Sequence, residues 1–373
     1  MSNLVLITGG AGFIGSHVAD ELLKQGYHVR ALDNLSPQVH GPGATRPAYL
    51  DSRVELQVGD VRHPAAVARA LDGVGAVIHL AAAVGVGQSM YRMRSYIEVN
   101  GVGTATLLDQ LAKRSVRRLV VASSMSIYGE GRYRAADGTE FDRVSRSVSD
   151  LKAGIWDPRG ADGAPLEPVP TPEDKSPLLN SVYALSKYDQ ERMCLMFGSA
   201  YGVPTVALRL FNTYGPRQSL SNPYTGVLAI FAARLLNGRP PVVFEDGRQR
   251  RDFVNVRDVA RAFALALTSE AAVGHAMNIG SGASLTILDV ARRLAQVLRL
   301  PQTSAEIAGQ YRVGDIRHCF ADTTLARELL GYEPSVSLEA GLGELGEWLR
   351  RAKAEDSYDV ARRELEIRGL TLG

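Results

Sequence analysis

The chain has 373 residues, of which 45% are hydrophobic and 22% are charged, a balance typical of globular proteins. Its 42 Lys and Arg and 40 Asp and Glu leave a net charge of +2 without a basic run, so nucleic acid is not an expected partner. Cys194 and Cys319 exclude a disulfide framework and lack metal-site spacing, so we predict no metal. No apolar run approaches the roughly 18 residues that span a membrane, so we expect a cytoplasmic protein without a membrane partner.

The first predicted strand and helix enclose a glycine-rich turn. Residues 4–7 are apolar and predict a buried strand, and the glycines at 9, 12 and 15 turn the chain into a helix that begins near Phe13. Glycine lets the backbone approach a pyrophosphate, whose charge is favourable at a helix N-terminus. A second strand, residues 27–32, ends at Asp33, whose carboxylate can bind both adenosine ribose hydroxyls and repels a 2′-phosphate. The pattern predicts a dinucleotide site for NAD rather than NADP.

Strand-like runs alternate with amphipathic stretches, such as 64–71 and 101–113, through the first half of the chain. This order predicts an α/β fold, a Rossmann-type doubly wound parallel sheet whose strand ends meet at one crevice. The expected strands are residues 4–7, 27–32, 54–58, 76–80, 118–122 and 205–210.

The alternation fails between Gly129 and Pro177, a segment rich in Gly, Pro, Asp, Arg and Ser. We expect an irregular insertion at about 130–177 within an NAD-binding domain of residues 1–210, either a lid over the crevice or a surface insertion without function. Residues 211–250 and 281–350 predict a smaller α/β substrate-binding lobe, with a return to the sheet near 251–280. The charged tail, 351–373, has no predicted role.

Tyr183 and Lys187 stand four residues apart on one face of a predicted helix. A phenol with a pKa of about 10 is a poor base at neutral pH, and a nearby ammonium group favours the phenolate. Ser124 follows the strand at 118–122, where its hydroxyl can bind an oxygen that is being oxidised and relay its proton to Tyr183. We therefore predict Ser124, Tyr183 and Lys187 as catalytic residues.

Together these segments resemble the extended short-chain dehydrogenase/reductase family of NAD-dependent nucleotide-sugar epimerases and dehydratases, from residue 4 to about 334. Residues 8–15 resemble its cofactor loop, residues 59–61 its adenine contact, and residues 79–82 the strand end that backs the cofactor. Asn100 matches the residue near the nicotinamide ribose. The resemblance implies the cofactor NAD, bound by Gly9, Gly12, Phe13, Ile14, Gly15, Asp33, Asn34, Asp60, Val61, Leu80, Ala81, Ala82, Asn100, Tyr183 and Lys187.

The resemblance also implies a nucleoside-diphosphate sugar, dTDP- or UDP-linked, as the substrate. Residues 208–217 are similar to the family's diphosphate segment, and residues 251–253 and 312–315 to the places where arginines bind the diphosphate. Phe244 matches the position that stacks the pyrimidine base, although a core Phe and surface-paired arginines are alternatives. The implied substrate contacts are Ser124, Ser126, Asn212, Arg217, Val242, Phe244, Arg251 and Arg312.

Family dehydratases carry Thr-Asp-Glu where this chain has Ser124, Met125 and Ser126. Neither Met nor Ser can do the acid–base work of eliminating water, so the resemblance favours a 4-epimerase. Such an enzyme oxidises C4 of the sugar to a ketone and reduces it again on the opposite face. Residues 84–91 and 123–131 and the insertion resemble those of enzymes that interconvert dTDP-L-rhamnose and dTDP-6-deoxy-L-talose, which is the preferred substrate pair.

Other reactions stay open. A UDP-glucuronate epimerase needs a cation near C6, which Arg92, Arg94 or Arg217 could supply, and a UDP-glucose 4-epimerase or a nucleotide-4-keto-sugar reductase would share the same motifs. A protein that binds NAD without chemistry would not need Tyr183 and Lys187. The resemblance further implies a homodimer through the helix of this pair and the helix near 101–113. The alternative is an intramolecular core role for the apolar residues Leu185, Met193, Leu195 and Met196.

Overall fold

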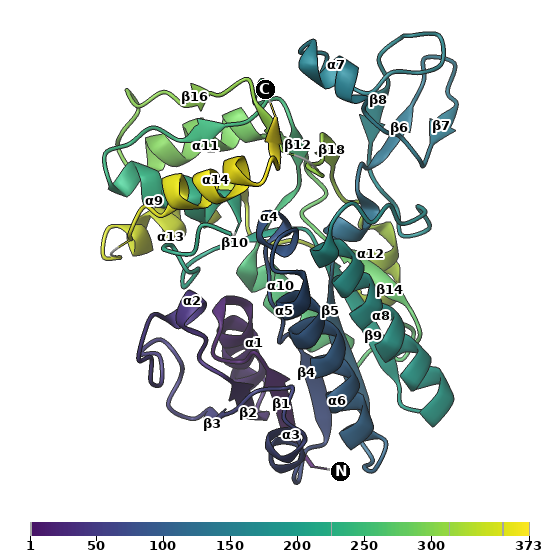
Figure 1. Ribbon diagram of the computed structural model, residues 1–373. Coiled ribbons are helices and arrows are strands. Elements are labelled where there is room, and N and C mark those ends of the chain that lie inside the picture. Colours follow the sequence, from purple (N-terminus) through teal and green to yellow (C-terminus); the bar gives the residue numbers. More distant parts are fainter. Residues whose placement is uncertain (1, 225, 313, 353, 373) are drawn as a thin grey trace.

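The computed structural model describes residues 2–224, 226–312, 314–352 and 354–372; Val313, inside the second arginine segment, lies outside them. Its centre is a seven-stranded parallel sheet in the order β14-β9-β5-β4-β1-β2-β3, which confirms the predicted doubly wound fold (Figure 1). The strands are β1 (Leu4–Thr8), β2 (His28–Asp33), β3 (Glu55–Val58), β4 (Ala76–His79), β5 (Arg118–Ser124), β9 (Thr205–Leu210) and β14 (Ala276–Ile279).

Both faces of the sheet are covered by helices, because alternate strand residues point to opposite sides. Val5 and Ile7 pack against α1 (Phe13–Lys24), α10 (Val256–Ala266) and α12 (Thr324–Leu330). Leu6 packs on the other face against α3 (Pro64–Ala70), α6 (Gly103–Leu111) and α8 (Val182–Tyr201). Burying each large apolar side chain contributes about 1.5–3 kcal/mol, so this sandwich holds the strand ends in fixed places.

A second lobe, at the upper left of Figure 1, has its own apolar core between α9 (Val227–Leu236), α11 (Ile287–Val297) and α13 (Leu338–Leu349). Short strand pairs surround this core. They are β10 (Asn212–Tyr214) with β13 (Phe253–Asn255), β11 (Val242–Val243) with β16 (Glu306–Ile307), and β12 (Arg250–Arg251) with β15 (Leu285–Thr286) and β18 (His318–Cys319).

The tail forms part of this lobe. It contains α14 (Tyr358–Ile367) and β19 (Thr371–Leu372), and β19 pairs antiparallel with β17 (Tyr311–Arg312). The remaining short helical elements are α2 (Pro37–His40), α4 (Val86–Ser89), α5 (Met93–Tyr96), η1 (Ile97–Val102) and η2 (Met125–Tyr128).

The segment at 130–177 is more ordered than expected. It forms an antiparallel sheet of β7 (Glu140–Phe141), β6 (Arg132–Arg134) and β8 (Glu167–Val169). The helix α7 (Val148–Lys152) lies between β7 and β8 in the chain, and Figure 1 shows it beside this sheet at the upper right. A small core of Tyr133, Val144 and Leu166 supports it. Its strands have two or three residues each, which is too short for a period of two to be visible in the sequence. Within the described ranges, no helix is long and apolar enough to cross a membrane.

Candidate active site

The turn between β1 and α1 provides a cradle for a pyrophosphate. Gly9 has a φ of +71°, and a Cβ on Gly15 would lie 2.3 Å from the Gly9 carbonyl oxygen, so both positions require glycine. Gly12 caps α1 without a side-chain hydrogen bond, which leaves the N–H groups of the first turn, at Phe13 and Ile14, for an anionic ligand. The donor set therefore fits the pyrophosphate of NAD.

Asp33 lies at the end of β2 with 8% of its surface exposed. Its Oδ2 accepts the Ala11 N–H at 3.0 Å and its Oδ1 accepts the Leu35 N–H at 2.9 Å, so the chain itself orients the carboxylate beside the glycine turn. This position fits the role predicted for it with an adenosine ribose. Each carboxylate oxygen retains a lone pair for a ligand hydroxyl.

The side chains of Asp60 and Val61 are occupied by contacts within the protein. The Asp60 carboxylate accepts the Asn34 side-chain amide at 3.0 Å and two N–H groups of Arg62 at 2.9 and 2.8 Å, and the Arg62 hydrogen bond is the main cause of its lowered pKa. Val61 packs in the core with 5% exposure. A contact from this pair to adenine would therefore come from its backbone.

The end of β4 is fixed by buried hydrogen bonds. The Leu80 and Ala81 N–H groups both donate to the Thr8 hydroxyl at 3.2 Å. Asn100 is fully buried, and its Oδ1 accepts the Ala83 N–H at 2.7 Å while its Nδ2 donates to the Ser186 hydroxyl at 2.9 Å. Asn100 thus ties the segment after Ala82 to α8.

The three predicted catalytic residues meet where β5 ends and α8 begins. The Ser181 hydroxyl caps α8 by accepting the Ala184 N–H at 3.1 Å, which places Tyr183 in the first turn. The side chain of Tyr183 lies close enough to that of Ser124, the last residue of β5, for the serine to lower the pKa of the phenol. Lys187 lies one turn further along α8 and is 3% exposed.

The electrostatics of this cluster differ from the sequence-based expectation. Burial raises the pKa of Tyr183, and the hydrogen bond from Ser124 opposes that shift. Burial also lowers the pKa of Lys187 to about 8, and its ammonium donates to Gln190 Oε1 at 2.7 Å. Gln190 was missed, although residues 183, 187 and 190 follow the i, i+4, i+7 spacing of a single helix face.

Most of the predicted substrate residues line one cavity of about 260 Å³ between the sheet and the second lobe: Ser126, Asn212, Val242, Phe244, Arg251 and Arg312. Ser124 lies directly beside it, since its hydroxyl donates to the Ser126 hydroxyl at 3.1 Å. Arg217 is not brought to this cavity. It lies against α1, with its guanidinium 2.8 Å from the Asp20 carboxylate and 5.6 Å from the centre of the Tyr49 ring.

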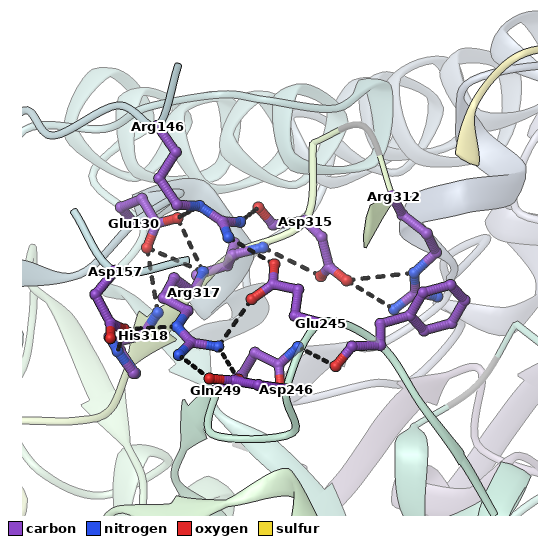
Figure 2. Close-up of polar contacts among 12 residues, drawn as sticks. Glu130, Arg146, Asp157, Glu245, Asp246, Gln249, Arg312, Asp315, Arg317 and His318 are labelled. Carbon is purple, nitrogen blue, oxygen red and sulfur yellow. Dashed lines mark hydrogen bonds and ion pairs between the residues drawn. The ribbon is translucent and has the colours of Figure 1, made fainter. Parts of the chain in front are cut away.

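Arg251 and Arg312 both line the cavity, and both are also ion-paired with Asp315. Arg312 lies 3.0 Å from the Asp315 carboxylate and 4.6 Å from the centre of the Phe244 ring, and dashed lines in Figure 2 join it to Asp315. Arg251 donates to the Arg317 carbonyl at 2.9 Å. Two guanidinium groups beside an aromatic ring are suited to a diphosphate attached to a flat base.

The insertion contributes a buried arginine that sequence reasoning missed. Arg146 lies 3.1 Å from Glu130 and 2.6 Å from Glu245, the residue after Phe244, and it donates to the Asp315 carbonyl at 2.9 Å (Figure 2). The side chains of Arg146 and both glutamates are at most 6% exposed. The insertion is therefore fastened to the cavity wall, and nothing local in its sequence distinguishes Arg146 from its exposed neighbour Arg143.

Comparisons with known proteins agree with this geometry. The NAD dependent epimerase/dehydratase family matches residues 5–148 and 161–280. A dTDP-L-rhamnose 4-epimerase of Burkholderia thailandensis is 37% identical over 92% of this chain and 94% of its own length. The structure of UDP-glucose 4-epimerase from Thermotoga maritima with UDP-glucose superposes with a TM-score of 0.75 at 30% identity, covering 93% of this chain and 99% of that one.

A third relative has been solved with its cofactor. The UDP-glucuronic acid 4-epimerase of Bacillus cereus, in complex with UDP-glucuronic acid and NAD, has a TM-score of 0.75 at 27% identity and covers 93% of this chain and 99% of that one. The chain belongs to the NAD dependent epimerase/dehydratase family. It is an enzyme of that family, and its cofactor is NAD.

Proposed function

We propose that the chain is a nucleotide-sugar 4-epimerase. The observation that carries the proposal is that Ser124, which lies close to Tyr183, contacts Ser126 in the wall of a cavity that Arg251, Arg312 and Phe244 also line. A sugar bound by its diphosphate at the arginines can reach these hydroxyls without leaving its anchor.

In this mechanism the Ser124 hydroxyl binds the C4 oxygen and Tyr183 takes its proton. Lys187, on the same helix face, supplies positive charge while it is protonated. NAD held at the glycine turn and Asp33 would supply the hydride chemistry at C4, and its positive ring would favour the Tyr183 phenolate that burial opposes. After the 4-keto sugar turns in the cavity, Tyr183 returns the proton and the configuration at C4 is inverted.

The preferred substrate pair is dTDP-L-rhamnose and dTDP-6-deoxy-L-talose. Val86, Met90 and Met125 line the cavity near Ser126 and give it an apolar wall suited to a C6 methyl group. The similarity to the Burkholderia thailandensis enzyme supports the same choice.

The arginines that could bind the C6 carboxylate of a uronate lie elsewhere. None of the three arginines considered for a C6 carboxylate is among the described residues that line the cavity. Arg94 has a 91% exposed side chain that pairs with Glu98, and Arg217 pairs with Asp20. UDP-glucose and UDP-glucuronate nevertheless serve as comparison substrates, because relatives of both kinds superpose on this chain.

The test is to incubate the purified enzyme separately with dTDP-L-rhamnose, UDP-glucose and UDP-glucuronate, without added cofactor, and to analyse products by chromatography and mass spectrometry. We expect an isomer of unchanged mass from dTDP-L-rhamnose. An isomer from a UDP sugar alone would reassign the substrate. Loss of water would indicate a dehydratase, and turnover only with a 4-keto sugar and reduced nicotinamide would indicate a reductase.

A further inference from the structure

The helix α14 runs along the substrate cavity. Four of its residues, Tyr358, Ala361, Arg362 and Leu365, line the cavity, and they follow the spacing of one helix face. Val360, directly before Ala361, lies on the opposite face and is 68% exposed. A helix with one face against a ligand cavity and the other in solvent is placed to shape what the cavity accepts.

The two ends of α14 face different parts of the site. Tyr358, at the N-terminal end of the helix, lines the same cavity as Arg312 and Arg251. Leu365 lies near α4, because a Cβ on Gly87 would be 3.4 Å from Leu365 Cδ2 (Figure 1). In the same short helix, the Ser89 hydroxyl accepts the Tyr183 N–H at 3.0 Å. The helix thus extends from the arginines toward the catalytic hydroxyls.

Contacts to both lobes hold α14 in this position. At its N-terminal end, Asp359 lies 2.7 Å from Arg239 and 3.4 Å from Arg234 in the second lobe. Beyond its C-terminal end, the Arg368 guanidinium lies 4.5 Å from the centre of the Tyr91 ring, which belongs to the segment after α4. The helix therefore bridges the cavity rather than lying on one side of it.

Tyr358 has a polar atom that the protein leaves unused. Its residue is 9% exposed, its hydroxyl is buried, and that hydroxyl has no hydrogen-bond partner. The Arg234 guanidinium packs on the ring at 4.7 Å from its centre and fixes the orientation of the side chain. Burying a hydroxyl without a partner is unfavourable, and a ligand oxygen in the cavity would remove that cost.

We propose that α14 is a wall of the nucleotide-sugar site and that the Tyr358 hydroxyl donates a hydrogen bond to the diphosphate of the substrate, beside Arg312. This inference rests on the proposed function, since it requires a nucleoside diphosphate in the cavity. It gives a substrate-binding role to a tail whose sequence indicated none.

The test compares Tyr358→Phe with the wild type by calorimetric titration of dTDP and UDP and by thermal unfolding. We expect the dissociation constant to rise about tenfold for the nucleotide that binds the wild type. The melting temperature of the ligand-free variant should be unchanged or higher, because the substitution removes an unpartnered hydroxyl. NAD content should not change. Tyr201→Phe is the matched control, because Tyr201 is 61% exposed at the end of α8.

A second pair of variants tests the wall itself. Ala361→Trp fills the cavity side of α14, whereas Val360→Trp adds the same bulk to its exposed side. We expect only Ala361→Trp to weaken nucleotide binding. Wild-type affinity in both Tyr358→Phe and Ala361→Trp would overturn the inference and leave the proposed function standing. A wild type that binds neither dTDP nor UDP would overturn both.

Discussion

At the scale of single residues, Tyr183 carries the clearest prediction. Tyr183→Phe removes the proton acceptor and keeps the ring, so kcat should fall about 10²–10⁴-fold while the bound NAD stays unchanged. The measurement is turnover of dTDP-L-rhamnose together with the NAD content of the purified variant. Tyr201→Phe, on the same helix but 61% exposed, should retain full activity. Undiminished turnover in Tyr183→Phe would exclude the mechanism.

His79 carries a prediction about pH. It is 1% exposed, with Nδ1 2.7 Å from the Thr8 hydroxyl and Nε2 2.9 Å from the Thr104 hydroxyl. Because the Thr104 hydroxyl donates to the Asn100 carbonyl at 2.6 Å, it accepts from His79 Nε2–H, whereas the Thr8 hydroxyl accepts two backbone N–H groups and donates to Nδ1, so the ring is neutral. Burial lowers the pKa of His79 from 6.5 to about 3.

A base whose pKa is depressed by folding stabilises the protein above its unfolded pKa and loses that contribution as the pH falls toward the folded pKa. For His79, the loss between pH 7 and pH 5 is about 2 kcal/mol. Urea unfolding at pH 7 and at pH 5 gives the difference in the free energy of unfolding between the two pH values. His79→Gln should reduce this difference by about 2 kcal/mol. The exposed His28→Gln should leave it unchanged, and an equal pH effect in both variants would contradict the assignment.

At the scale of elements, the insertion at 130–177 acts through Arg146. Arg146→Leu leaves buried Glu130 without its ion-pair partner and Glu245 with Arg317 alone, which should lower the free energy of unfolding by about 3 kcal/mol. Because Glu245 follows Phe244, nucleotide affinity should fall as well. Urea unfolding and dTDP titration measure the two effects. Arg143→Leu, at an exposed site in the same segment, is the control, and equal behaviour of both variants would mean that the insertion is not fastened by Arg146.

At the scale of the whole molecule, we propose a homodimer through the outer face of α8 and η1. Leu185 and Met196 are 48% and 56% exposed on α8, and Ile97 on η1 is 41% exposed. Met193 and Leu195 instead pack against the core of the monomer, so the four apolar residues of this helix divide between two roles. Exposed apolar groups on adjacent helices are typical of an interface.

The double variant Leu185→Glu, Met196→Glu should sediment as a monomer if this face is the interface, because it would place like charges against each other across a two-fold axis. Analytical ultracentrifugation measures the change. Val360→Glu introduces a charge at an exposed apolar residue of α14, outside the proposed interface, and should keep the wild-type mass. A double variant that still sediments as the wild type would move the interface elsewhere.

Features that depend on neighbours in the chain could be predicted from the amino-acid sequence. The glycine turn, Asp33 at a strand end, and the four-residue spacing of Tyr183 and Lys187 are local patterns, and a strand or helix converts such spacing directly into geometry. The alternation of strands and helices fixed the parallel sheet, because short crossovers admit few arrangements.

The tertiary structure decided what depends on contacts between distant segments. The pairing of Arg146 with Glu245, the contact of Arg312 with Phe244 and the passage of α14 along the cavity join parts of the chain that no local period relates. Arg217 went to α1 for the same reason, since its backbone φ of +70° and its neighbours, rather than its motif, set its direction. Burial raises the pKa of Tyr183 and so opposes the expected effect of Lys187 and of the nicotinamide ring, because desolvation is a property of the packed core and not of the residues next to it in sequence.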